Sequence, residues 1–201
     1  EGGQHYEAID YTIECDWSAA AMIMVAAAIA GEVKLLNLSM LSRQADTAVC
    51  RALERAGASL IIEESSVTVA HRELHAFEFD ATQCPDLFPA LVALAAAADG
   101  VSRISGIGRL RGKESDRGET LREEYAKLGI DIELDYEADV MLVVGGQPHA
   151  AAVDSHDDHR IAMSLAITAL RIADDVEISN RECVAKSYPS FFEDLRSLMC
   201  E

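Results

Sequence analysis

Residues 18–30 read SAAAMIMVAAAIA, a run in which Ser18 is the one polar side chain. A helix at a protein surface carries a polar face, so a helix that is apolar all round is a buried one. The run is also too short to cross a bilayer, for which about 20 apolar residues are needed. It therefore predicts a buried helix of a globular core, with Asp16 or Ser18 as its N-cap and Gly31 at its end.

The same pattern recurs twice along the chain. Residues 87–98 read LFPALVALAAAA and stop at Gly100, and residues 160–173 form a third largely apolar helix. Gly31 and Gly100 lie 69 residues apart, and each apolar run stands between two predicted strands. A repeated order of elements at a nearly fixed spacing indicates an internal repeat, here of βαβαββ type.

Each copy of the repeat predicts its own set of elements. We expect strands 11–14 and 33–38, helix 45–55 and hairpin 59–63 with 67–70 in the first copy; strands 75–81 and 101–107, helix 119–128 and hairpin 130–134 with 140–144 in the second; and strands 151–154 and 176–179 with a last helix at 190–198 in the third. The third copy lacks the closing hairpin. Either it ends differently, or another part of a longer protein completes it.

The three apolar helices determine the expected layering. Helices that are apolar on every face share one interior, so their sheets lie outside them. No Pro/Gly/Ser-rich linker divides the chain. We expect an α/β fold in a single lobe over residues 1–201, with repeats at about 9–72, 73–147 and 148–201.

Composition limits the classes of function. The formal net charge of −18 argues against nucleic acid or an anionic membrane as partner, because both need a broad basic surface. Five scattered cysteines without a CxxC motif predict neither a disulfide framework nor a zinc site, and they favour a reducing, cytoplasmic compartment. The polar start has no signal-peptide core and no initiator Met, so we expect a piece of a longer protein.

Positive charge is concentrated in one stretch of this acidic chain. Residues 103–122 read RISGIGRLRGKESDRGETLR and hold six of the 17 basic residues. Glu114 and Asp116 stand among these cations, between a predicted strand and a predicted helix. The arrangement suits the binding of an anion with proton transfer beside it. A solvated loop of compensating charges is the ordinary alternative.

Acidic residues also recur at the start of each apolar helix. They are Asp16, Asp86 and the pair Asp157 and Asp158. An N-cap role alone explains such residues. Arg160, however, follows the third pair in the first helical turn, and a cation beside a helix N-terminus favours phosphate or carboxylate.

Few other residues fit a chemical motif. Lys186 and Lys113 occupy equivalent strand-to-helix connections in the third and second repeats, which distinguishes Lys186 from an ordinary solvated lysine.

His156 and His159 have a spacing that a metal site can use, but the sequence places no third ligand beside them, and no metal site is predicted. There is no GxSxG, no Cys/His pair at a known spacing and no phosphate-binding loop.

Four segments resemble signature motifs of one enzyme family. They are CPDLFP (residues 84–89), RLRGKESDR (109–117), DHRIAM (158–163) and KSYPSFF (186–192). In sequence, order and spacing they are similar to motifs of 5-enolpyruvylshikimate-3-phosphate synthase, and the likeness covers essentially the whole chain. The resemblance implies two lobes, each of three βαβαββ units, with the substrates between them. This chain looks like the C-terminal lobe, an enolpyruvate-transferase-like lobe whose third unit is incomplete.

The resemblance also implies a reaction and its residues. The family transfers the enolpyruvyl (1-carboxyvinyl) group of phosphoenolpyruvate to the 5-hydroxyl of shikimate 3-phosphate and releases phosphate, with no cofactor and no metal. By motif position, Asp86 would be the general base, Glu114 would move a proton at the methylene carbon, and Lys113 would bridge the substrates. The substrate-binding residues would be Lys113, Arg117, Arg160, Lys186, Asp86 and Ser18.

The sequence departs from the family's pattern in two places. Ser18 is kept, but Ala19, Ala20 and Ala21 follow it where the family has a serine-rich turn. Arg109 or a neighbour stands where the family has an asparagine that contacts the shikimate moiety. Neither change touches the residues expected to bind phosphoenolpyruvate.

Two other functions stay open at this point. The sister family, UDP-N-acetylglucosamine enolpyruvyl transferase, shares the repeat fold but lacks the KESDR and DHRIAM motifs. A non-catalytic anion-binding module would keep the cations without needing Asp86 and Glu114. If the resemblance holds, the missing N-terminal lobe supplies the other wall of the site, and we expect this chain to be inactive alone.

Overall fold

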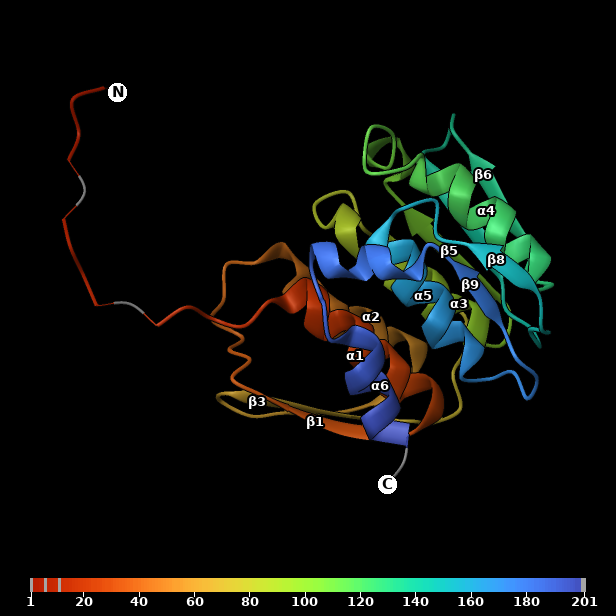
Figure 1. The fold of residues 1–201 in the computed structure, drawn as a ribbon, viewed down its shortest axis with the longest axis horizontal. Coiled ribbons are helices and arrows are strands. Elements are labelled where there is room, and N and C mark those ends of the chain that lie inside the picture. Colours follow the sequence, from red (N-terminus) through yellow and green to blue (C-terminus); the bar gives the residue numbers. More distant parts are fainter. Residues whose placement is uncertain (1, 6, 11, 200–201) are drawn as a thin grey trace.

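Three buried helices form the interior of the fold. The computed structural model describes residues 2–5, 7–10 and 12–199. In it, α1 (Trp17–Ala30), α3 (Phe88–Ala97) and α5 (His159–Ala169) each contact the other two. Figure 1 shows these helices in the middle of the molecule with the strands around them. The predicted layering, with apolar helices inside and sheets outside, is confirmed.

The first of these helices forms where the sequence predicts it. Residues 20–29 are all buried, because no side chain among them needs contact with water. The Asp16 carboxylate accepts a hydrogen bond of 2.8 Å from the Ser18 backbone N–H, which satisfies one free donor of the first turn. The helix ends before Gly31, whose N–H bonds to the carbonyl of Ala27.

Each repeat contributes one sheet to the outer layer. The first sheet has the order β1 (Glu32–Leu36), β3 (Ser66–Ala70), β2 (Ser59–Ile62), with both pairs antiparallel. The second has the order β4 (Glu78–Asp80), β5 (Val101–Ser105), β7 (Val140–Val144), β6 (Ile132–Asp135), and β4 runs parallel to β5. The third consists of the parallel strands β8 (Ala152–Asp154) and β9 (Glu177–Ser179).

The remaining helices lie between or after these strands. They are α2 (Val49–Ala56) with the 3-10 turn Ala45–Ala48 before it, α4 (Arg117–Lys127), α6 (Phe191–Met199), and the 3-10 helices Pro85–Leu87, Ile107–Arg109 and Arg181–Lys186. Helix α4 begins two residues earlier than expected, because the Thr120 N–H already bonds to the carbonyl of Asp116. No helix in the described part of the chain has both the length and the apolar character to span a membrane.

Several predicted strands are absent or shorter in the structure. The expected strand 33–38 ends at Leu36, and the expected strand 101–107 ends at Ser105, with a 3-10 helix from Ile107. Residues 12–14 of the expected strand 11–14 form no strand and are exposed, while Tyr11 lies outside the described residues. Alternating apolar residues do not hold a strand that has no partner for its backbone groups. The expected strand 75–81 is reduced to β4, since His75 forms just an isolated bridge with Asp99.

The third sheet stops short of the other two. In the first two sheets a later strand pairs antiparallel with the strand that follows the buried helix: β3 with β1, and β7 with β5. Within the described residues, β9 pairs with β8 alone. A cavity of 360 Å³ lies beside it, and its lining includes Ala166, Ile178 and Phe192. That a further segment completes this sheet stays a prediction.

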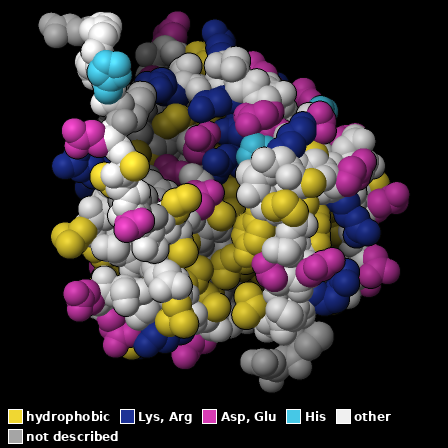
Figure 2. Space-filling model, turned by 60° about the vertical axis from the view of Figure 1, so that its left-hand side comes forward, with side chains coloured by type: hydrophobic (Ala, Val, Ile, Leu, Met, Phe, Trp, Pro, Cys, Tyr) yellow, Lys and Arg dark blue, Asp and Glu magenta, His cyan; other side chains and the backbone are white. Residues whose placement is uncertain are grey.

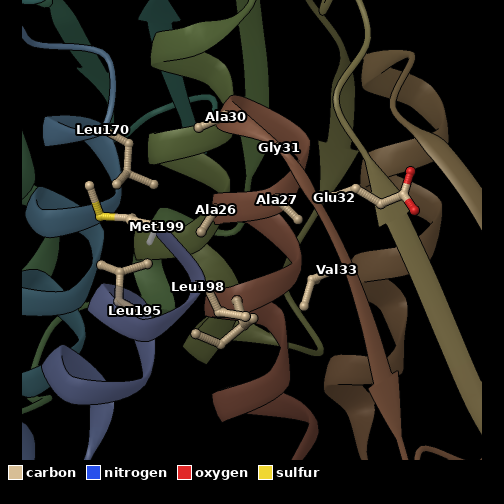
Figure 3. Close-up of a pocket in the computed structure, with 11 residues that line it drawn as sticks. Ala26, Ala27, Ala30, Gly31, Glu32, Val33, Leu170, Leu195, Leu198 and Met199 are labelled. Carbon is tan, nitrogen blue, oxygen red and sulfur yellow. The ribbon is translucent and has the colours of Figure 1, made fainter. Parts of the chain in front are cut away.

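A second cavity, of 320 Å³, lies between α1 and α6. Figure 3 shows Leu195, Leu198 and Met199 facing Ala26 of α1 across it. Helices α1 and α5 reach the cavity at their C-terminal ends, where Ala30 and Leu170 line it. The acidic residues singled out by the sequence lie at the opposite ends of these helices, so this cavity is remote from them.

The turn after β7 makes a tight contact with the end of α3. A Cβ built on Gly145 would lie 1.8 Å from the carbonyl oxygen of Ala98. We expect Gly145→Ala to lower the free energy of unfolding by about 2 kcal/mol or more, because backbone has to move. Urea denaturation measures the change. Gly31→Ala is the matched control, since nothing lies within 4 Å of its added Cβ; equal losses in both variants would contradict the close approach.

Candidate functional site

Arg117 is the centre of a cluster of charged side chains. Its own side chain is 1% exposed, and its guanidinium donates to three carboxylates. Nε lies 2.8 Å from Asp158 Oδ2, Nη1 lies 2.7 Å from Asp86 Oδ1, and Nη2 lies 2.7 Å from Glu114 Oε2. Each guanidinium nitrogen thus has a charged partner, which is the condition for burying an arginine.

Helix starts bring these carboxylates together. Asp86 lies in the 3-10 helix before α3, and Glu114 lies in the loop before α4. Asp158 caps α5, where its Oδ1 accepts a hydrogen bond of 3.0 Å from the Arg160 N–H. The sequence singled out the helix starts, and the structure brings two of their acids to one guanidinium. Asp16, the matching acid of the first repeat, caps α1 instead.

Asp86 is the carboxylate that several cations approach. Lys113 Nζ lies 3.2 Å from its Oδ1, and Arg160 Nη2 lies 3.8 Å from its Oδ2. The Asp86 side chain is 37% exposed, whereas that of Asp158 is fully buried. Figure 2 shows basic and acidic side chains around a hollow in the upper part of the view, with a band of hydrophobic side chains below it. The cluster is therefore open to a small anion at its Asp86 end.

The interactions within the cluster favour the ionised forms. Burial raises the pKa of Asp86, but Arg160, Arg117 and Lys113 more than offset this, and the net pKa lies below its usual range. Burial also raises the pKa of Asp158, but the hydrogen bond from Arg117, the charge of Arg117 and the Arg160 N–H together outweigh it, and the net pKa lies below its usual range. Burial lowers the pKa of Arg117, while Asp158 and Asp86 raise it above its usual value. At pH 7 both carboxylates and the guanidinium are charged.

His159 also belongs to the cluster, although the sequence marked it just as a possible metal ligand. Its Nδ1 lies 3.7 Å from Glu114 Oε1 and has no hydrogen-bond partner within the described residues. Burial, and then the charge of Arg160, lower the pKa of His159, so the imidazole is neutral at pH 7. Its position directly after the N-cap of α5 is the signal that could have identified it. No group of three or more His, Cys, Asp or Glu in the described parts of the chain is arranged for a metal ion.

Lys186 lies at the edge of the cluster. Its Nζ donates to the backbone carbonyl and to the carboxylate of Asp157, each at 2.7 Å, and its side chain is 44% exposed. The hydrogen bond to Asp157 raises the pKa of Lys186. Because Asp157 directly precedes Asp158, the same loop holds Lys186 and the buried partner of Arg117.

Ser18 contacts a carboxylate rather than a cation. Its hydroxyl donates a short hydrogen bond to Asp46, a buried residue at the start of the helical segment before α2. The pKa of Asp46 lies above its ordinary value, chiefly because the residue is buried. The hydrogen bond from Ser18 and the charge of Arg160 lower this pKa, and the charge of Asp86 raises it. Asp46 therefore lies within the field of the cluster. Nothing in the sequence singled it out.

Most basic residues of the stretch 103–122 lie elsewhere. Arg122 pairs within α4, and the Arg111 guanidinium lies 4.5 Å from the centroid of the Tyr136 ring. Arg109, which stands near the expected shikimate contact, is exposed at the end of a 3-10 helix. Two of the six basic residues belong to the cluster: Lys113 and Arg117.

Comparison with known families finds one whose model matches nearly the whole chain. The family model described as EPSP synthase (3-phosphoshikimate 1-carboxyvinyltransferase) matches residues 1–195. The chain belongs to the EPSP synthase family. The predicted family resemblance is thereby confirmed.

Curated relatives of this family are similar over nearly the whole chain. The 3-phosphoshikimate 1-carboxyvinyltransferase of Clostridium perfringens is 41% identical over 201 residues, which cover 98% of this chain and 47% of the relative. That of Methanosarcina acetivorans is 40% identical over 202 residues, which cover 98% of this chain and 46% of the relative. The chain thus spans about half the length of the EPSP synthase relatives it matches.

Solved structures agree on the fold. EPSP synthase from Acinetobacter baumannii matches with a TM-score of 0.82 and 31% identity, covering 92% of this chain and 46% of that one. The enolpyruvyl transferase NikO from Streptomyces tendae matches with a TM-score of 0.73 and 20% identity, covering 94% and 44%; at that identity the likeness concerns the fold alone. The predicted enolpyruvate-transferase-like fold is confirmed.

Removing the Arg117 guanidinium leaves buried Asp158 without its charged partner. We expect Arg117→Met to lower the free energy of unfolding by about 3 kcal/mol or more. Arg122→Met, on the same helix but with a side chain 49% exposed, should lower it by less than about 1 kcal/mol. Urea denaturation at pH 7 compares the two variants. Losses of similar size would show that Arg117 does not hold the cluster together.

Buried His159 makes stability depend on pH near neutrality. Its folded-state pKa lies below the ordinary value of 6.5, so its contribution is complete above that value and is lost as the pH falls through the folded-state pKa. Asp86 and Asp158 add a further loss, but below their ordinary value of 3.8. We expect the free energy of unfolding to fall between pH 7 and about pH 5.5, and less so in His159→Gln.

Urea titrations at several pH values measure this dependence. Exposed His5 is the control, and His5→Gln should keep the pH dependence of the unsubstituted chain. The same slope in His159→Gln would mean that another group titrates in this range.

Proposed function

We propose that this chain is part of an enzyme that transfers the enolpyruvyl group of phosphoenolpyruvate to the 5-hydroxyl of shikimate 3-phosphate and releases phosphate. The curated relatives are named for the 3-phosphoshikimate 1-carboxyvinyltransferase activity. The observation that carries the proposal is the surroundings of Asp86, a partly exposed carboxylate approached by Arg117, Lys113 and Arg160. Such a carboxylate can accept a proton while the cations beside it bind an anionic substrate.

The proposed ligands of phosphoenolpyruvate are Arg117, Arg160 and Lys186. This substrate is a small, multiply charged anion that converging arginines and lysines bind without a metal. Two nitrogens of Arg117 now donate to Asp86 and Glu114, whose side chains are 37% and 38% exposed. A substrate carboxylate that displaces one of these acids would meet a guanidinium whose orientation Asp158 already fixes.

In the proposed reaction, Asp86 is the general base. The 5-hydroxyl oxygen bonds to C2 of phosphoenolpyruvate as its proton passes to Asp86, and Glu114 supplies a proton to C3, which gives a tetrahedral intermediate. Glu114 then takes a proton back from C3, the C2=C3 double bond re-forms, and the C2–O bond to phosphate breaks, which releases phosphate. Lys113 would bridge the two substrates, and Ser18 is a further proposed substrate contact at the start of α1.

The chain provides one side of such a site. It spans about half the length of its relatives, and the cluster is open at Asp86. Closure of a second lobe would exclude water and strengthen the charge interactions around the substrates. We therefore propose a second lobe as the partner of this one, and we expect no turnover from the 201-residue chain alone.

The test uses the complete protein encoded by the native reading frame. We expect shikimate-3-phosphate-dependent release of phosphate from phosphoenolpyruvate, with kcat lowered about a hundredfold or more in Asp86→Asn because the general base is removed. Asp99→Asn is the control, since Asp99 is exposed and lies outside the cluster; its kcat should be unchanged. The isolated chain is assayed in parallel.

Each contrary outcome points to a different alternative. Full activity of Asp86→Asn would exclude Asp86 as the base. Transfer to UDP-N-acetylglucosamine in place of shikimate 3-phosphate would indicate the sister activity. Binding of phosphoenolpyruvate by the complete protein without any phosphate release would indicate an anion-binding module, and turnover by the isolated chain would show that one lobe suffices.

A further inference from the structure

Glu124 is a buried carboxylate outside the cluster. It lies on α4, two helical turns after Arg117, and its side chain is 1% exposed. Its oxygens accept hydrogen bonds from Lys127 Nζ at 2.8 and 2.7 Å, from the Asp154 N–H at 2.8 Å and from His156 Nε2 at 2.8 Å. Both oxygens are thus satisfied, which a buried charge requires.

These contacts hold Glu124 in its ionised form. Burial raises its pKa, but the hydrogen bonds from Lys127, Asp154 and His156 outweigh burial, and the net pKa lies below its usual range. An ionised carboxylate can only accept hydrogen bonds, so Nε2 of His156 carries the proton of that contact.

One of these contacts falls on His156, in the turn between β8 and α5 (residues 155–158), and another falls on Asp154, the last residue of β8. His156 and Asp157 in this turn both have left-handed backbones, with φ of 52° and 57°. That conformation costs an L-residue about 1–2 kcal/mol, so the surroundings have to maintain it. Asp154 also stabilises this backbone conformation, because its Oδ1 accepts a hydrogen bond of 2.7 Å from the His156 N–H.

The turn and the first residues of α5 make three contacts with charged side chains in or beside the cluster. Asp157 holds Lys186, Asp158 holds Arg117, and Arg160 lies beside Asp86. A displacement of the turn would therefore move all three contacts together. Helix α4 carries Arg117 at its start and Glu124 seven residues later, so one helix positions both the guanidinium and the loop that supplies its buried partner.

We propose that Glu124 is a positioning residue that fixes the turn 155–158 and thereby sets the places of Asp157, Asp158 and Arg160. Its side chain is buried, so its role is exerted through the turn and not by contact with a substrate. The kinetic part of this inference rests on the proposed function, in which Arg117, Arg160 and Lys186 bind phosphoenolpyruvate. A shift of the turn then weakens phosphoenolpyruvate binding more than shikimate 3-phosphate binding.

The experiment compares Glu124→Ala, Glu124→Gln and the control Glu123→Ala in the complete protein. Glu123 is the exposed neighbour on the same helix. We expect Glu124→Ala to raise the KM for phosphoenolpyruvate about tenfold, with a smaller change for shikimate 3-phosphate. Glu124→Gln keeps an acceptor for the Asp154 N–H and should stay within about threefold of the unsubstituted protein. Glu123→Ala should change neither KM.

A purely structural role would give a different result. Glu124→Ala would then reduce the amount of folded protein and leave the KM values of the folded fraction unchanged, and this outcome overturns the proposal. If Glu124→Ala does not fold, His156→Ala removes one contact of the same carboxylate at a side chain 41% exposed. A raised KM for phosphoenolpyruvate in that variant supports the proposal, and an unchanged one overturns it.

Amide hydrogen exchange gives a readout that does not depend on turnover. We expect faster exchange at Asp154, His156 and Asp158 in Glu124→Ala or His156→Ala, and not in Glu123→Ala. An inactive unsubstituted protein would contradict the proposed function while this readout still tests the positioning role. Unchanged exchange at these amides overturns it.

Discussion

A buried arginine is stable only where acceptors surround it, and Arg117 obtains them from the chain segments that begin α3, α4 and α5. The bodies of the three central helices offer little besides apolar side chains, so polar groups can enter the interior chiefly at the helix ends. N-terminal ends carry unpaired N–H groups and a positive dipole, which favour carboxylates. Packing of the apolar helices and clustering of the charges are thus two results of one arrangement.

The same arrangement explains how an acidic chain can present an anion site. With a net charge of −18, the surface as a whole repels anions. Charges in solvent are screened beyond about 8 Å at physiological ionic strength, whereas Arg117, Arg160 and Lys113 lie within 4 Å of Asp86. Over such short distances, in a partly buried setting, the local cations determine the potential that a small ligand meets.

How much of this the sequence predicts depends on whether a feature is local. The central helices are evident because their composition leaves no polar face, and Asp86 and Asp158 are evident because an acid at a helix start is a local signal. Asp46 and Glu124 are not, since their partners Ser18 and Asp154 lie far along the chain, and no spacing rule reports such contacts. The expected strand at 11–14 fails for the same reason: a strand needs a partner, which alternation does not reveal.

Among the described residues β9 pairs with β8 alone, and this has a consequence for the behaviour of the 201-residue chain in solution. An exposed strand edge offers backbone donors and acceptors to another copy and can seed β-aggregation. Exposed Asp174, Asp175 and Glu177 stand at or just before this strand, and two copies approaching edge to edge would bring these negative charges together. Salt shortens the range of that repulsion, from about 10 Å at 0.1 M to about 3 Å at 1 M. Charge repulsion is therefore what protects this edge from pairing with another copy, and this protection is strongest in dilute buffer and weakest in concentrated salt.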